Sequence, residues 1–116
     1  MTEITDFLLA RIAEDELGAE AAKAAIAGSG GPWRSSSQVV LGAGVHPVAT
    51  TDAAFHAEHI ARFDPDRVIR ECIVKRGIVA GWSKPDSSTG RMLMAAMAAV
   101  YSDHPDYKLE WRDLSR

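Results

Sequence analysis

The first part of the chain carries apolar residues at steps of three and four positions, which is the spacing of one face of an α-helix. The residues with this spacing are Ile4, Phe7, Leu8 and Ile12. The alanine-rich sequence that follows them also favours helix. The stretch GSGGPW at 28–33 ends the pattern, because glycine supplies a C-terminal turn and proline cannot continue a helix. We therefore predict a helix over residues 3–27.

Two short runs come next, SSQVVLG and GVHPVAT, joined around the glycine-bearing segment 42–44. They predict a small β-hairpin at about residues 36–50. Pro47 then has to lie on an outer edge, because proline has no N–H to donate to a strand ladder. A two-stranded ribbon is not stable alone in water, so we expect the hairpin to pack on the helices.

A second helix is predicted after the hairpin, with Thr51 or Asp52 as its N-cap and its end near Arg62. The large residues expected on its inward face are Phe55, His59 and Ile60.

The sequence FDPDR, residues 63–67, predicts a corner between two helices. Asp64 has the position of an N-cap, and Pro65 has the first helical position, where its missing N–H is not needed. The residue before a proline avoids helical geometry, so the preceding helix ends near Phe63. The Asp-Pro pair is thus explained as a structural corner without any catalytic role.

The third predicted helix covers residues 65–80. The apolar residues on its expected buried side are Val68, Ile69, Cys72, Ile73 and Val79. On the outer face Arg67, Glu71 and Lys75 follow at four-residue steps, so we expect them to pair along the helix.

A fourth helix is predicted from about Ser88 to Tyr101 and is apolar nearly all round. Such a helix lies in the centre of a core or forms part of an interface. The tail then repeats the corner, with His104 before Pro105. Together these elements predict a single, mainly α (α+β) domain over residues 1–116, with about four helices and the hairpin between the first two.

The composition is that of an ordinary globular protein, with 47% hydrophobic and 25% charged residues. The formal net charge of −3 argues against a nucleic-acid binder that relies on bulk positive charge. The single cysteine, Cys72, excludes an internal disulfide and fits a reducing compartment. No signal peptide is recognised, and the most apolar window, 92–101, is too short to span a bilayer. We therefore expect a cytoplasmic protein without a membrane partner.

Four side chains are candidates for a metal site or for acid–base chemistry: His56, His59, His104 and Asp103. His56 and His59 are three residues apart, which places them on neighbouring positions of one helical face. A zinc site needs further ligands that only the fold can bring near, and the sequence has neither a CxxC nor an HExxH motif. We predict no metal or other cofactor, and a metal-binding protein or small hydrolase is the alternative function.

No residue is predicted to be catalytic. Cys72 falls on the expected buried side of a helix, where a thiol behaves as a small hydrophobe, and no serine lies in a GxSxG elbow. The basic residues within 62–76 are interleaved with acids, which weakens the field that phosphate recognition requires. Weak nucleic-acid binding is therefore a third and less favoured function.

Tryptophans in or beside loops and the methionines of the fourth helix favour protein binding, because part-exposed Trp rings anchor partners and Met suits adaptable contacts. The expected partner-binding residues are Trp33, Trp82, Trp111, Met92, Met94 and Met97. The fourth helix offers more apolar surface than one small core consumes, so a homodimer through this helix is the interface we expect.

Three stretches and the Trp after the first helix carry a resemblance: TDFLLARIAEDE (5–16), AEHIARFDPDRVIRECIVKRGIV (57–79) and YSDHPDYKLEWR (101–112). These parts are similar to an uncharacterised family, a domain of unknown function, of small proteins from actinobacteria and their phages. The family typically has His where this chain has Phe63. That His would make an HxxxH pair with His59, so its absence lowers the metal hypothesis.

The resemblance implies a bacterial or phage protein of the cytoplasm and supplies neither an activity nor a catalytic residue. We therefore predict a non-enzymatic accessory protein of a phage, prophage or actinobacterium. It would act by binding a host or phage protein whose identity the sequence does not reveal.

Overall fold

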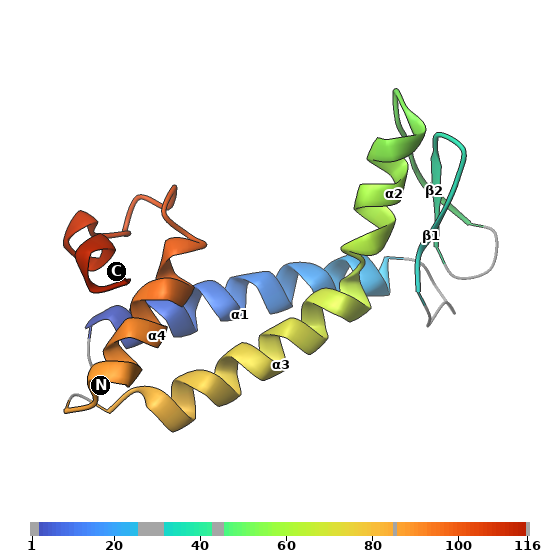
Figure 1. Cartoon of the computed structure of the whole chain (residues 1–116). Coiled ribbons are helices and arrows are strands. Elements are labelled where there is room, and N and C mark those ends of the chain that lie inside the picture. Colours follow the sequence, from blue (N-terminus) through green and yellow to red (C-terminus); the bar gives the residue numbers. More distant parts are fainter. Residues whose placement is uncertain (1–2, 26–31, 43–45, 85, 116) are drawn as a thin grey trace. The chain divides into compact units, whose positions relative to one another are not determined.

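The computed structural model describes residues 3–25, 32–42, 46–84 and 86–115 (Figure 1). Its helices are α1 (Glu3–Ala24), α2 (Ala54–Arg62), α3 (Pro65–Trp82) and α4 (Ser88–Ala99), and its strands are β1 (Arg34–Ser36), β2 (Val39–Leu41) and β3 (Pro47–Thr50). A 3₁₀-helix, η1 (Leu109–Ser115), follows α4. The predicted mainly α class, with a β element between the first two helices, is confirmed. The predicted end of the first helix, at residue 27, lies outside the described residues.

The chain forms two compact units. Unit 1 consists of Met1–Glu14 and Cys72–Arg116, and unit 2 consists of Asp15–Glu71. The helices α1 and α3 each contribute one part to each unit. Among the described residues, no helix combines the length and the apolar character that a membrane crossing requires.

Unit 2 contains a three-stranded antiparallel sheet in which β2 lies between β1 and β3. The predicted hairpin corresponds to β2 and β3, and the prediction missed β1. The reason is a turn at Ser37 and Gln38, which splits the run SSQVVLG between two strands. Ser37 has φ of 55°, a left-handed conformation that a serine seldom adopts and that sequence alone does not indicate. Pro47 lies on the edge strand β3, opposite Leu41, where its lack of an N–H is tolerated.

The helix α2 packs on this sheet through alanine (Figure 1). Ala57 and Ala61 form the buried core of unit 2 together with Val40. The half-buried residues packed against this core are Trp33, Val48 and Ala49. Alanine side chains four residues apart let the helix backbone approach the sheet closely, since they present only methyl groups at the contact.

Two predictions about α2 are wrong. Phe55, His59 and Ile60 were expected to face inward, but all three are exposed, because the alanine face occupies the sheet. The N-cap is Ala53, with no side-chain cap, rather than Thr51 or Asp52. The Thr51 hydroxyl instead lies 2.8 Å from the carbonyl oxygens of Gln38 and of Ala53, within hydrogen-bonding reach of both.

The corner between α2 and α3 is built around Asp64, which immediately precedes Pro65, the first residue of α3. One carboxylate oxygen of Asp64 accepts a hydrogen bond from the backbone N–H of Arg67 at 2.9 Å, which satisfies a free donor of the first helical turn. Farther along unit 2, Lys23 near the end of α1 pairs with Asp66 of α3 at 3.0 Å.

Unit 1 has its own core, made by the first part of α1, the second part of α3, α4 and η1. Its buried hydrophobic residues are Phe7, Leu8, Ile12, Cys72, Val79, Met94, Ala95, Ala98 and Trp111. The Cys72 thiol donates a weak hydrogen bond to the carbonyl of Ile12 at 3.7 Å. Ile73 was predicted to be buried, but it is 59% exposed, because the inward side of α3 in this unit runs through Cys72 and Val79.

The connection from α3 to α4 is tight. Ser87 is the N-cap of α4, and its hydroxyl accepts a hydrogen bond from the Gly90 N–H at 3.0 Å. A Cβ atom added to Gly90 would lie 2.1 Å from the carbonyl oxygen of Trp82. The start of α4 can approach the end of α3 this closely only because position 90 has no side chain.

Candidate functional site

The exposed side of α2 carries Phe55, His56, His59 and Arg62, and the C-cap residue Phe63 follows them. We call these five residues the aromatic face of α2. Phe55 is 67% exposed and Phe63 is 45% exposed. The face arises from helical spacing, because positions 55, 59 and 63 lie opposite positions 57 and 61 on a 3.6-residue helix. The same helix therefore presents alanine to the sheet and aromatic rings to the surroundings.

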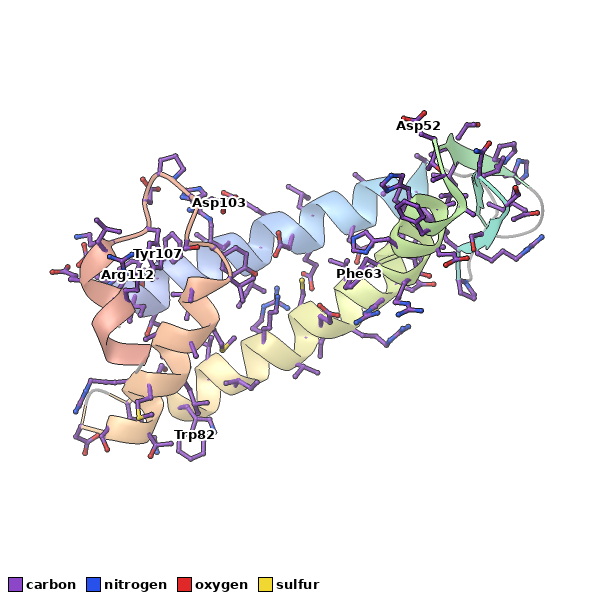
Figure 2. The ribbon with its side chains drawn as sticks, turned by 45° about the horizontal axis from the view of Figure 1, so that its top comes forward. Asp52, Phe63, Trp82, Asp103, Tyr107 and Arg112 are labelled. Carbon is purple, nitrogen blue, oxygen red and sulfur yellow. The ribbon has the colours of Figure 1, made fainter. Side chains whose placement is uncertain are left out.

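The rings of this face contact one another. The centroids of Phe55 and His56 are 4.4 Å apart, and those of His59 and Phe63 are 4.8 Å apart. Figure 2 labels Phe63 where α2 meets α3. The Arg67 guanidinium carbon lies 4.3 Å from the centroid of the Phe63 ring, a distance at which a cation is attracted to the ring.

The Arg67 guanidinium is held in this position from two sides. It pairs with Glu71 at 2.9 Å, as the predicted four-residue spacing requires, and it donates to the carbonyl oxygen of Arg62 at 3.2 Å. Lys75, the third member of the predicted row, instead lies 3.4 Å from the Tyr101 hydroxyl. Arg67 therefore forms an ordered ion pair with Glu71 beside the Phe63 ring.

A contiguous exposed apolar patch commonly marks a binding site, whereas single exposed apolar residues need no explanation. Here the exposed rings form two pairs, Phe55 with His56 and His59 with Phe63, and the Arg67 guanidinium lies over the Phe63 ring. Such an arrangement can bind an apolar surface that carries carboxylates beside it.

Unit 1 contains a second aromatic group, which is a packing element rather than an open surface. The ring centroid of Phe7 lies 6.4 Å from Tyr101, 5.7 Å from His104, 6.1 Å from Tyr107 and 5.0 Å from Trp111. Most of these contacts are edge-to-face, the favoured geometry of aromatic pairs. The cluster joins α1 to the segment that follows α4.

Arg11 lies beside this cluster and is only 9% exposed. Its guanidinium donates to the Glu14 carboxylate at 2.7 Å and to Nδ1 of His104 at 2.9 Å. The backbone N–H of Asp106 also donates to His104 Nδ1, at 3.0 Å. Since both partners are donors, Nδ1 carries no proton and the His104 ring has an acceptor role. His104 thus holds the turn around Pro105 in place, as a structural corner does.

The four candidates for metal or acid–base chemistry are divided equally between the two units. His56 and His59 belong to unit 2, whereas Asp103 and His104 belong to unit 1. In the described parts of the chain, no group of three or more His, Cys, Asp or Glu residues could hold a metal ion.

The predicted partner-binding residues divide into buried and accessible members. Trp111 and Met94 lie in the core of unit 1, being 5% and 2% exposed, so they are not available to a partner. Trp82 and Met92 are exposed, whereas Trp33 and Met97 are half-buried. Figure 2 shows Trp82 at the end of α3.

Sequence reasoning missed the aromatic face of α2 because it assigned the largest side chains to the core. The available signal was the pair Ala57 and Ala61, which follows the same four-residue step on the opposite side of the helix. In the structure these two small residues are the ones that pack against Val40 of the sheet.

A protein-family model, described as a family of unknown function (DUF6221), matches residues 1–113 of the chain. Neither the curated proteins nor the solved structures contain a match.

Proposed function

Because the chain belongs to this family of unknown function, membership supplies no activity, and we propose a role from the arrangement of its residues. We propose that the protein is a non-enzymatic accessory protein that acts by binding another protein. The contact surface is the aromatic face of α2.

The observation that carries this proposal is the exposure of Phe55 and Phe63 on a helix whose alanine side already packs on the sheet. Fully burying a phenylalanine side chain stabilises a complex by about 1.5–3 kcal/mol. Phe55 and Phe63 are already partly covered, so each would contribute less than this on binding. The cation–ring contact between Arg67 and Phe63 holds one ring in place before binding, and this reduces the ordering that a partner must impose.

The partner is a protein with an apolar strip flanked by carboxylates. The apolar strip would cover Phe55 and Phe63, and the carboxylates would face Arg62, because Arg67 is already paired with Glu71. In a cytoplasmic bacterial setting, which the sequence resemblance implies, this partner would be a host or phage protein. The alternative partner for the aromatic face is a second copy of the chain.

The metal-binding and hydrolase alternative gains no support, since no group of three or more His, Cys, Asp or Glu residues in the described part of the chain could hold a metal ion. Nucleic-acid binding gains none either. Arg67 is paired with Glu71 at 2.9 Å and Lys23 with Asp66 at 3.0 Å, so carboxylates neutralise part of the positive charge in unit 2.

The test is affinity capture from an actinobacterial lysate with the wild-type protein and two variants. Phe55→Ser combined with Phe63→Ser removes both rings of the aromatic face. Leu17→Ser is the matched control, because Leu17 is an exposed apolar residue of unit 2, 73% exposed, on α1. We expect one protein to be captured by the wild type and the control and lost from the double variant.

Light scattering of the purified proteins then shows whether the aromatic face binds a second copy of the chain or a different protein. A wild-type dimer that the double variant converts to a monomer would assign the face to a second copy of the chain. A captured partner that the double variant retains as well as the control does would refute the role of the aromatic face.

A further inference from the structure

Unit 1 contains a pocket of about 240 Å³ that is separate from the aromatic face of α2. It lies where the start of α1, the end of α3, the start of α4 and η1 meet, and the residues that define it are Ile4, Trp82, Lys84, Arg91, Met94 and Trp111. We propose that this pocket binds a small organic anion with a flat apolar body, such as an aromatic carboxylate.

The inner walls of the pocket suit a flat apolar body. Trp111 and Met94 are part of the unit 1 core and present a fixed apolar surface. Trp82 is 45% exposed, so its indole can cover a ligand from the open side. Indole rings stack well on other aromatic rings and bury a large apolar area in doing so.

The volume of the pocket limits the size of the ligand. An apolar cavity of about 150 Å³ in another protein already accepts benzene, and pockets for drug-sized ligands begin at about 300 Å³. The volume of this pocket, about 240 Å³, lies between the volume that accepts benzene and the volume of a pocket for a drug-sized ligand. A body of one or two fused rings therefore fits it.

The charges around the pocket favour an anionic head group. Lys84 and Arg91 line it together with one carboxylate, that of Glu3. The Glu3 carboxylate is already paired with Lys108 outside the pocket lining, and this pairing raises the pKa of Lys108 above 10.5, chiefly through the hydrogen bond to Glu3. Two cationic side chains therefore line the pocket, and its one lining carboxylate is paired with a lysine.

The backbone keeps these groups in place. Gly90, which also lines the pocket, lies against the Trp82 carbonyl group, so the α3–α4 connection positions Trp82 and Arg91 on the same rim. Arg91 is in the first turn of α4, where the helix dipole adds to the attraction for an anion. The site therefore combines a fixed apolar wall with a positively charged rim.

The test uses three probes with the same two-ring body and different charge. These are indole-3-acetate, which is anionic, 3-methylindole, which is neutral, and tryptamine, which is cationic. Each is titrated into the full-length protein, and binding is followed by the NMR shifts of the tryptophan indole N–H groups. We expect the anion to bind about tenfold more tightly than the neutral probe, with the Trp82 signal shifting, and the cation to bind most weakly.

Charge-removing variants locate the head group. Lys84→Gln and Arg91→Gln should each lower the affinity for indole-3-acetate by about threefold to tenfold and leave that for 3-methylindole unchanged. Arg70→Gln is the control, since Arg70 is an exposed cation of unit 2, and it should change neither. Circular dichroism of each variant shows whether it is folded.

Three outcomes would overturn the proposal. They are no saturable shift of Trp82 with any probe up to about 5 mM, tryptamine binding as tightly as indole-3-acetate, or an Arg70→Gln effect equal to that of Lys84→Gln. The proposal does not depend on the protein-binding function, since the pocket and the aromatic face share no residue and are assayed separately.

Discussion

The carboxylate of Asp64 accepts a hydrogen bond from the backbone N–H of Trp33, at 3.0 Å and across 31 residues of sequence. The other oxygen of the same carboxylate caps α3 through the Arg67 N–H. Asp64 is only 5% exposed. Water therefore could not readily replace its carboxylate as the acceptor for these two N–H groups. One buried side chain therefore fixes the helix corner and the segment that enters the sheet.

Replacing Asp64 by alanine should lower the free energy of unfolding by about 2–4 kcal/mol, because a helix cap and a second charge-assisted hydrogen bond are lost together. Asp64→Asn should lower it less, since its single carbonyl oxygen can still accept one of the two bonds. Urea unfolding followed by circular dichroism measures both. Asp52→Ala, at an exposed carboxylate, is the control, and an equal loss there would argue against the dual role of Asp64.

Two glycine substitutions should have opposite effects. Gly90→Ala should destabilise unit 1 by about 2 kcal/mol or more, because its Cβ would lie 2.1 Å from the backbone carbonyl oxygen of Trp82. Gly77→Ala should stabilise the protein by about 0.5–1 kcal/mol, since the added methyl group at this position of α3 meets no described atom within 4 Å. The melting temperatures of the two variants, compared with that of the wild type, measure both effects. An unchanged melting temperature in Gly90→Ala would mean that α3 and α4 are not in this close contact.

The ion pair between Lys108 and Glu3 should contribute to stability only below a strongly alkaline pH. The hydrogen bond to Glu3 raises the pKa of Lys108 above its ordinary value of 10.5. A group whose pKa is raised by folding stabilises the folded state fully below its unfolded pKa, and this contribution is lost as the pH rises through the folded value. Lys108→Met should therefore melt at a lower temperature than the wild type at neutral pH, and the difference should shrink above pH 10.5.

High salt provides an independent check on that pair. Both side chains are largely exposed, so added salt should reduce the difference between Lys108→Met and the wild type. A difference that persists unchanged at high pH and high salt would instead reflect the packing of the lysine stem.

The segment that follows α4 should be stabilised by the aromatic rings of Tyr107 and Trp111 and not by the hydroxyl group of Tyr107. Within the described residues, the Tyr107 hydroxyl is buried and has no hydrogen-bond partner. Tyr107→Phe should therefore leave the free energy of unfolding unchanged or raise it by about 1 kcal/mol. Trp111→Ala should lower it by about 3–5 kcal/mol, because that ring lies 5.0 Å from Phe7 in the unit 1 core. A marked loss in Tyr107→Phe would reveal a partner for the hydroxyl.

Local chemistry explains which parts of the fold could be predicted. The Asp64–Pro65 corner depends only on a capping carboxylate and on the fixed φ of proline, and both are evident in the sequence. The strand β1 could not be predicted in this way, because it depends on the left-handed conformation of Ser37. Serine carries no strong signal for that conformation.

The orientation of α2 is a second feature that could not be predicted from the sequence. Phe55 and His59 follow the same four-residue step as Ala57 and Ala61, so helical periodicity is satisfied with either side facing the sheet. Only the tertiary contact with Val40 decides between them. The sequence thus supplied the helix, whereas the surface that forms the candidate site depended on a neighbour distant in the chain.

The division of the chain between the two units has a consequence for biosynthesis. Unit 2 is a single continuous stretch, whereas unit 1 combines Met1–Glu14 with Cys72–Arg116. During translation, every residue of unit 2 is available before the second stretch of unit 1 has been made. The first turns of α1 can therefore complete the unit 1 core only after α4 and Trp111 have been made, so Phe7 and Leu8 lack their folded-state partners until the end of synthesis.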